Sequence, residues 1–245
     1  MQTIGALRVR THGATGAPVI VLHGGPAAVG GAAGLARGLA DRFRVLEPWQ
    51  RGSGASPLTV ATHVADLRVL IETAWPGERP ALIGESWGAM LALAFAAAHP
   101  RAAAAIVLVG CGTFDLATRA QLQATLADRA NDPYPYDYSI DRERRAEEPF
   151  DERAHTETWN DMLRLQAEGV YPAAFAAIRA PVLMLHGSYD PHPGGMIRDG
   201  LRPVLPQLEY AEFERCGHSP WKERLARDDF FDALRAWLST VMRGA

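Results

Sequence analysis

The segment Gly84-Glu85-Ser86-Trp87-Gly88 has the residue types and spacing of a nucleophilic site. It matches G-x-S-x-G between an expected strand and an expected helix, the context in which this pattern places a reactive serine on a sharp turn. Glycines two residues to either side leave room for the strained backbone of such a turn. The following helix points backbone N–H groups at the site, where they can stabilise negative charge. Ser86 is therefore the candidate nucleophile.

A serine nucleophile needs a base, and the base needs an acid that fixes its tautomer. His218 follows the last strand-like stretch, and Asp190 follows the strand-like stretch before it. Both are expected at the carboxyl ends of sheet strands, where open α/β sheets place their sites. We therefore predict Asp190 as the acid and His218 as the base. Asp115, which also follows an expected strand, is the alternative acid.

A glycine-rich turn, His23-Gly24-Gly25-Pro26, follows an earlier apolar stretch. The backbone N–H groups of Gly25 and Trp87 are the candidate donors of an oxyanion hole. These features together predict acyl transfer at a serine. Such chemistry requires no metal ion and no cofactor, and we predict neither.

The remaining histidines and the cysteines have weaker contexts. We expect surface or helix-end roles for three histidines without an acid–serine context, which are His12, His63 and His99. His186 is expected to be a buried histidine with satisfied hydrogen bonds, whereas His192 is close enough to Asp190 to compete with His218. Cys216 is expected to be a small buried side chain in a turn rather than a nucleophile.

Strand-like and helix-like segments alternate along the chain, which predicts an α/β fold with a mostly parallel central sheet flanked by helices. Short apolar or alternating runs predict strands at residues 18–22, 43–46, 81–83, 105–109, 181–185 and 208–213. Helical spacing or composition predicts helices at residues 60–75, 89–99 and 224–241.

Residues 112–177 interrupt this alternation, because they lack apolar strand runs and carry 13 of the 28 acidic residues against 7 arginines. We predict one sheet-based core formed by residues 1–111 and 178–245, with residues 112–177 as a small helical cap, or lid. The acids of this insert either form a solvated face or favour neutral and cationic substrates. Its aromatic tract at residues 133–138, together with Trp159, either lines a pocket or pins the lid to the core.

Composition excludes several function classes for this chain of 245 residues. Hydrophobic residues make up 48% and charged residues 22%, which is ordinary for a folded domain. A net charge of −3 favours neither nucleic acid nor an anionic membrane as partner. The two cysteines, Cys111 and Cys216, do not suggest a disulfide framework, and no apolar run is long enough to span a bilayer. We therefore expect a cytoplasmic protein with a small-molecule substrate, whereas its oligomeric state is unknown.

Several segments resemble those of α/β-hydrolase fold proteins, and within them of the proline iminopeptidase (prolyl aminopeptidase)-like group. These segments are residues 23–26, Gln50-Arg-Gly-Ser-Gly54, residues 64–67 and residues 84–93. The resemblance implies the same nucleophile, acid, base and oxyanion donors. The chain departs from the group's pattern at Trp49, where Asp is usual, and at Glu85, where Gly is common. The group's aminopeptidases also carry a larger cap, whose acids hold the substrate's amino group.

These observations predict a serine hydrolase that cleaves a carboxylic ester, lactone or small amide through an acyl-serine intermediate. The alternatives are proline iminopeptidase activity, which would require a cap acid such as Glu147 or Glu148, and a non-catalytic ligand-binding protein of the same fold. A lyase or acyltransferase could use the same side chains. Glu85 and Trp159 are the candidate substrate-binding residues.

Overall fold

The computed structural model describes residues 1–129 and 148–244 of the chain. In these residues an eight-stranded sheet has the order β1-β2-β4-β3-β5-β6-β7-β8. The pairs β1/β2 and β2/β4 are antiparallel, and the other neighbours are parallel. The strands are β1 (Gln2–Ile4), β2 (Leu7–His12), β3 (Pro18–Leu22), β4 (Arg44–Trp49), β5 (Ala81–Glu85), β6 (Ala105–Val109), β7 (Val182–Gly187) and β8 (Leu208–Phe213).

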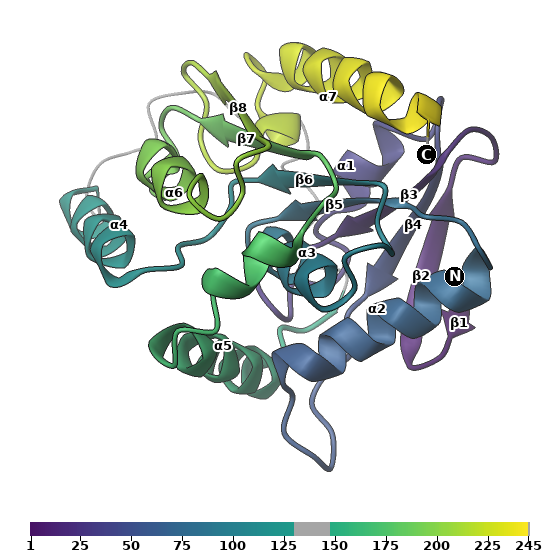
Figure 1. Ribbon diagram of the computed structural model, residues 1–245, viewed down its shortest axis with the longest axis horizontal. Helices are drawn as coiled ribbons and strands as arrows, with labels where there is room; N and C mark the ends of the chain where they lie inside the picture. The colour runs from purple at the N-terminus through teal and green to yellow at the C-terminus, as the bar shows by residue number, and fades with distance from the viewer. Residues whose placement is uncertain (130–147, 245) are drawn as a thin grey trace.

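Helices cover both faces of this sheet. Helices α1 and α7 lie on one face, and α2 and α3 lie on the other (Figure 1). The α-helices are α1 (Ala33–Arg37), α2 (Val60–Ala74), α3 (Trp87–Ala98), α4 (Leu116–Asp128), α5 (Glu152–Ala167), α6 (Gly194–Leu201) and α7 (Arg227–Val241). Short 3₁₀ helices are η1 (Ala173–Ala177), η2 (Pro220–Lys222) and η3 (Met242–Gly244).

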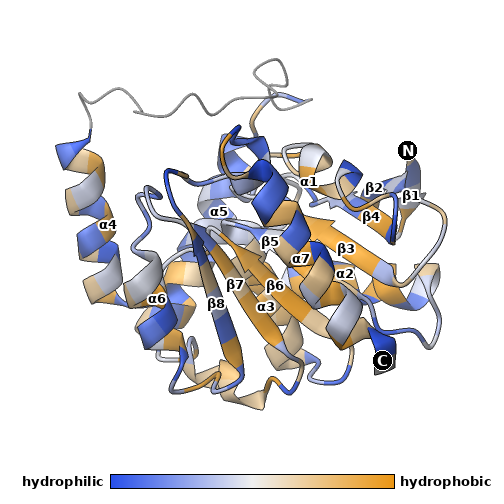
Figure 2. Cartoon of the chain, turned by 90° about the horizontal axis from the view of Figure 1, so that it is seen from above, coloured by the Kyte–Doolittle hydropathy of each residue, from blue (hydrophilic) through white to orange (hydrophobic). Residues whose placement is uncertain are grey.

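Burial on both faces explains why the central strands are apolar along their length. All residues of β3, β5, β6 and β7 are buried, and Figure 2 shows these strands coloured as predominantly hydrophobic. One hydrophobic core lies between the sheet and α2 and α3, and a second lies between the sheet and α1 and α7. A parallel sheet covered in this way brings the carboxyl ends of β3, β5, β6, β7 and β8 to one edge.

The predicted fold class is confirmed, and so is each of the six predicted strands, although β4 and β5 extend beyond residues 46 and 83. The helix predicted at 89–99 begins at Trp87, and the last begins at Arg227 rather than at residue 224. The hairpin of β1 and β2 was missed. The alternation of Leu7, Arg8 and Val9 is its signal, since the two apolar side chains are buried and the arginine between them is exposed.

The insert, residues 112–177, contains α4, α5 and η1 in its described part. Figure 2 shows α4 apart from the sheet, with hydrophilic and hydrophobic residues mixed along it, and α5 packs against α2. The aromatic tract at 133–138 and Glu147 lie outside the described residues. Within residues 1–129 and 148–244, no helix has both the length and the apolar character needed to cross a bilayer.

Candidate functional site

Ser86 occupies the turn between β5 and α3 in a backbone conformation that residues other than glycine rarely adopt, with φ 53° and ψ −115°. The turn is tight because a Cβ atom at Gly84 would lie 2.1 Å from the Gly88 carbonyl carbon. A Cβ atom at Gly88 would in turn lie 2.4 Å from the Leu22 carbonyl oxygen. The Ser86 N–H donates to the Val109 carbonyl at 2.8 Å, which ties the turn to the end of β6. Strain of this kind persists only where the surroundings enforce it.

His218 and Asp190, predicted from positions 28 residues apart, are brought together by the loops after β8 and β7. The His218 Nδ1 lies 2.8 Å from the Asp190 Oδ2. The two loops are held by backbone contacts, since the Tyr189 N–H donates to the Cys216 carbonyl at 2.7 Å. The Gly217 N–H donates to the buried carboxylate of Glu223 at 2.8 Å. These backbone contacts hold the two loops together next to the His218–Asp190 contact.

The histidine loop also lies beside the Ser86 turn. A Cβ atom at Gly110, the residue after Val109, would lie 3.0 Å from the His218 ring. The Ser219 hydroxyl donates to Glu85 Oε1 at 3.4 Å, and the Gly24 N–H donates to Glu85 Oε2 at 3.1 Å. Glu85 thus connects the glycine-rich turn, the Ser86 turn and the histidine loop. Both of its oxygens face protein groups, which is a positioning arrangement, and its predicted contact with substrate stays a prediction.

Asp190 and His218 form an ion pair at this edge. Burial lowers the pKa of His218, but the charge and hydrogen bond of Asp190 outweigh it, and with Glu85 they raise the pKa to about 9. Burial by itself raises the pKa of Asp190, whereas its contacts with His218, His192 and His186 bring it well below the usual range. The carboxylate therefore stays ionised and can stabilise a positive imidazolium.

Two further histidines contact Asp190. The His192 Nδ1 lies 3.0 Å from Asp190 Oδ1, and the His186 Nε2 lies 3.2 Å from Asp190 Oδ2. His186 is fully buried, as expected, and burial lowers its pKa. However, its Nδ1 has no hydrogen-bond partner in the described residues, so its hydrogen bonds are only half satisfied. The predicted proximity of His192 to Asp190 is confirmed.

Of the two candidate oxyanion donors, Trp87 follows Ser86 in the chain and Gly25 follows a residue that lies against it. A Cβ atom at Gly24 would lie 3.1 Å from the Ser86 Cβ, which places the glycine-rich turn against the serine. Gly25 follows in that turn with φ 38°, and Trp87 is the first residue of α3, whose N–H has no intrahelical acceptor. Their role as oxyanion donors stays a prediction.

A network that the sequence reasoning missed holds this turn in place. His23 is fully buried, its Nδ1 lies 3.0 Å from the Gly24 carbonyl oxygen, and its Nε2 accepts the Gln50 N–H at 3.1 Å. Burial lowers the pKa of His23, so the neutral ring that this pattern requires is favoured. The Gln50 side chain links the His23 carbonyl to the Trp87 indole N–H at 3.1 and 2.7 Å. Their positions after β3 and β4 are the signal that could have identified both residues.

The expectation of a surface or helix-end role is wrong for His63. Its ring is buried, its Nε2 lies 3.0 Å from the Thr158 hydroxyl of α5, and burial lowers its pKa to about 4. The Trp87 ring makes edge-to-face contacts with the rings of His63 and Trp159, with ring centroids 6.0 and 6.4 Å apart. Trp159 is therefore joined to the residue after Ser86 by one aromatic contact, whereas its predicted contact with substrate stays a prediction.

The other candidates have structural positions. Asp115 caps α4 by accepting the Thr118 N–H at 2.9 Å, whereas Asp190 is the acid that contacts His218. Cys216 is buried as expected, and burial raises the pKa of its thiol, which disfavours the thiolate. His12 ends β2 and is half-buried, and its Nε2 lies 2.9 Å from the carboxylate of the buried Glu47.

Metal-ligating side chains gather at one place in the described residues. Ligand atoms of Asp190, His192 and His218 all lie within 4.8 Å of one another. The Nδ1 atoms of His192 and His218 both face oxygens of Asp190 at hydrogen-bond distance. These residue types suit zinc, but the same contacts serve an acid–base pair.

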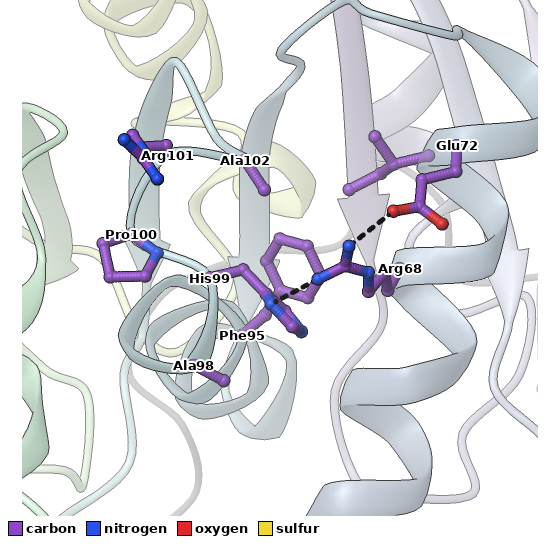
Figure 3. A pocket seen from close by; sticks show the side chains of 9 residues that line it. Arg68, Glu72, Phe95, Ala98, His99, Pro100, Arg101 and Ala102 are labelled. Carbon is purple, nitrogen blue, oxygen red and sulfur yellow. Dashed lines mark hydrogen bonds and ion pairs between the residues drawn. The ribbon is translucent and has the colours of Figure 1, made fainter.

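A separate surface pocket lies at the opposite edge of the sheet, where α3 ends (Figure 3). Two of its charged side chains form an ion pair, since Arg68 lies 2.8 Å from Glu72, and Arg68 also lies 3.1 Å from the His99 Nδ1. His99 thus has the helix-end role that we expected. The length of α3 separates this pocket from Ser86, so it does not belong to the candidate site.

The family match covers the N-terminal half of the chain, which also contains the segments that resemble α/β-hydrolase fold proteins. The sequence profile of the alpha/beta hydrolase fold family matches residues 17–139. The proline iminopeptidase of Neisseria gonorrhoeae is 40% identical over 104 residues, which cover 39% of this chain and 33% of that protein. The match therefore spans about a third of the length of the curated relatives.

Solved structures resemble the whole chain. An esterase from Thermogutta terrifontis has a TM-score of 0.71 at 20% identity, with 96% of this chain and 93% of that one covered. An E-2-(acetamidomethylene)succinate hydrolase has a TM-score of 0.73 at 20% identity, with 95% of each chain covered. At this identity the likeness establishes a shared fold.

Proposed function

Because the chain belongs to the alpha/beta hydrolase fold family, we propose that it is a serine hydrolase that cleaves a carboxylic ester, lactone or small amide through an acyl-serine intermediate. The observation that carries the proposal is the strained Ser86 turn beside the His218–Asp190 pair. Strained backbone of this kind clusters at functional sites, and the paired histidine and carboxylate supply the base that a serine requires.

In the proposed mechanism, Ser86 attacks the substrate carbonyl while His218 takes the hydroxyl proton. Asp190 holds the imidazole by its Nδ1 and stabilises the positive charge that develops on it. The N–H groups of Gly25 and Trp87 stabilise the oxyanion. His218 then donates the proton to the leaving group, and water hydrolyses the acyl-serine by the same steps. All of these groups are side chains or backbone amides, and the proposal needs no cofactor.

The insert is proposed to act as a lid that selects the substrate. It supplies α5, which packs on α2 and contacts Trp87 through Trp159. An aromatic side chain at this position offers an apolar surface to an acyl or leaving group. We keep the predicted boundaries for this proposal, with residues 112–177 as lid and residues 1–111 and 178–245 as core.

Labelling with a fluorophosphonate tests the proposal independently of substrate, because the reagent reacts with activated serines. We expect the wild-type chain to be labelled, and Ser86→Ala to lose both labelling and at least about 10³-fold in kcat/KM toward short acyl esters. Ser239→Ala, on α7 away from the site, is the matched control and should behave as wild type. An unlabelled wild-type chain would overturn the proposal and favour the non-catalytic alternative.

Proline iminopeptidase activity is the second candidate, because 104 residues of this chain are 40% identical to a protein of that name. The structure adds one observation in its favour, since Glu148 lines a pocket together with Ala27 and Gln50, next to the glycine-rich turn. A panel of acyl esters, lactones and prolyl amides separates the two. Turnover of esters with inert prolyl amides would exclude the peptidase, and the reverse preference would establish it.

A further inference from the structure

We infer that His192 is a positioning residue, which fixes the Asp190 carboxylate and the His218 ring in their working orientation. The inference rests on the proposed function, because it assigns a role within the proposed triad. His192 has direct contact with both of its partners, whereas its own ring remains 19% exposed.

The first support is the division of labour between the two oxygens of Asp190. Oδ1 faces His192 twice, by the backbone N–H at 2.9 Å and by the ring Nδ1 at 3.0 Å. Oδ2 faces the His218 Nδ1 at 2.8 Å. The His186 Nε2 also lies 3.2 Å from Oδ2, but its hydrogen bond goes to the His192 carbonyl oxygen at 3.1 Å. A carboxylate oxygen accepts about two hydrogen bonds. Rotation of the carboxylate would break both contacts of Oδ1, so His192 keeps Oδ2 directed at His218.

The second support is the local sequence, in which prolines flank His192 on both sides. Pro191 has no N–H, so the first amide after Asp190 that can donate to its side chain belongs to His192. The resulting contact is the local turn that Asp side chains commonly form two residues ahead. Pro193 restricts the backbone of the residue before it to extended conformations. The His192 ring is therefore held on a backbone with little freedom.

The third support is the stacking of the two rings. The centroids of His192 and His218 lie 4.8 Å apart with an interplanar angle of 21°. A single hydrogen bond at Nδ1 would leave the His218 ring free to swing about it. The flat face of His192 limits that swing on one side. The tautomer that fits both contacts carries a proton on the Nδ1 of each ring, which leaves the His218 Nε2 free to act as the base.

Three substitutions separate the hydrogen bond from the stack. His192→Asn keeps a donor near the position of Nδ1 and loses the ring, His192→Phe keeps a ring and loses the donor, and His192→Ala loses both. We expect kcat to fall about 10- to 100-fold in His192→Ala and less in the other two, with KM nearly unchanged. His99→Ala, at the opposite edge of the sheet, is the control and should match the wild type.

The pH profile of kcat/KM distinguishes positioning from loss of stability. The charged and titratable groups around His218 are Asp190, Glu85, Lys222, His186 and the stacked ring of His192 itself. If Asp190 turns away, His218 loses its strongest partner, and the acidic limb moves to lower pH. We expect this shift in His192→Ala and His192→Phe, and little shift in His192→Asn. A merely structural role would lower the amount of folded protein and leave the limb in place.

Two further measurements complete the test. NMR titration of the His218 ring in the same variants reports its pKa without any substrate, so it decides the inference even if the wild type fails to label and the proposed hydrolase function falls. Unchanged kcat, pH limb and His218 titration in all three variants would overturn the inference. Activity retained in His218→Ala but lost in His192→Ala would also overturn it, because His192 would then be the base.

Discussion

Two regions of the molecule are stabilised by different kinds of contact: the turns at the carboxyl edge of the sheet, and the insert where it attaches to the core. At the sheet edge, backbone bonds fix the turns, such as Ser86 N–H to the Val109 carbonyl and Tyr189 N–H to the Cys216 carbonyl. The insert is instead attached by side chains, chiefly carboxylates of α5 that accept backbone N–H groups of the core. A catalytic group on the first kind of support keeps its place through many substitutions, whereas the second kind depends on a few residues.

Three acids illustrate the attachment of the insert. Asp151 accepts the Ser53 N–H at 2.7 Å, Glu157 accepts the Leu58 N–H at 2.9 Å, and Asp161 accepts the Val60 N–H at 2.8 Å. Hydrogen bonds from the N–H groups of Ala154 and Ser53 lower the pKa of Asp151, and the bond from Leu58 does the same for Glu157. For these three acids, the structure supports neither a purely solvated face nor a field directed at substrate, because they dock the insert.

The two helices of the insert differ as well. Helix α5 buries Ala154, Thr158 and Met162 against the core, whereas α4 buries only Thr118 among its residues. Polar contacts from arginines attach α4, with Arg119 donating to Gln166 and Arg129 donating to the Tyr189 carbonyl next to Asp190. Helix α5 is therefore the fixed part of the insert, and α4 is its loosely packed part.

The largest expected effect concerns pH and lies on the sheet edge. His218 must be neutral to accept the Ser86 proton, and its pKa is raised to about 9, so activity should climb as pH rises through that value. We expect kcat/KM at pH 7 to lie about 100-fold below its alkaline plateau. If the acidic limb of the pH profile of kcat/KM had its midpoint at or below pH 6.5, this would contradict a strongly coupled His218–Asp190 pair.

Glu85→Gln refines this prediction, because the charge of Glu85 also raises the pKa of His218. Glutamine can still accept the Gly24 N–H and contact Ser219, so the turns should keep their places. We expect the limb to move to lower pH and kcat/KM at pH 7 to rise severalfold. Glu72→Gln, at the far pocket of Figure 3, should leave the profile unchanged.

The second prediction concerns the attachment of α5. Thr158→Val keeps the side-chain shape but leaves the buried Nε2 of His63 without its partner, at a cost of about 1–3 kcal/mol in the free energy of unfolding. Thr156 is exposed on the same helix, so Thr156→Val should change the free energy of unfolding by about 0.5 kcal/mol or less. Urea unfolding measures both. Fluorophosphonate labelling should persist in both variants, and equal unfolding midpoints would show that this contact does not attach the insert.

The same contrast explains what the sequence could predict. The proximity of the candidate residues Ser86, Asp190 and His218 could be predicted because a parallel sheet brings residues after its strands to one edge, whatever their distance in the chain. His63 was misjudged because helical spacing does not reveal that a helix far along the chain covers it. His23 and Gln50 also directly follow strands, as the candidate triad residues do. However, a histidine and a glutamine that bind backbone groups form no recognisable sequence motif. Side-chain contacts between distant segments follow from tertiary packing, which composition does not encode.

The smallest expected effect tests whether any exposed acid of the insert contributes to function. Glu148 pairs with Arg8 at 2.6 Å, but both side chains are more than 40% exposed, and such pairs contribute little to stability. We therefore expect Glu148→Gln and its matched partner variant Arg8→Met to change ester turnover by less than about twofold. Prolyl amide turnover is the sharper measurement. If it falls at least tenfold in Glu148→Gln alone while ester turnover holds, the carboxylate binds a substrate amine, and the insert selects by charge after all.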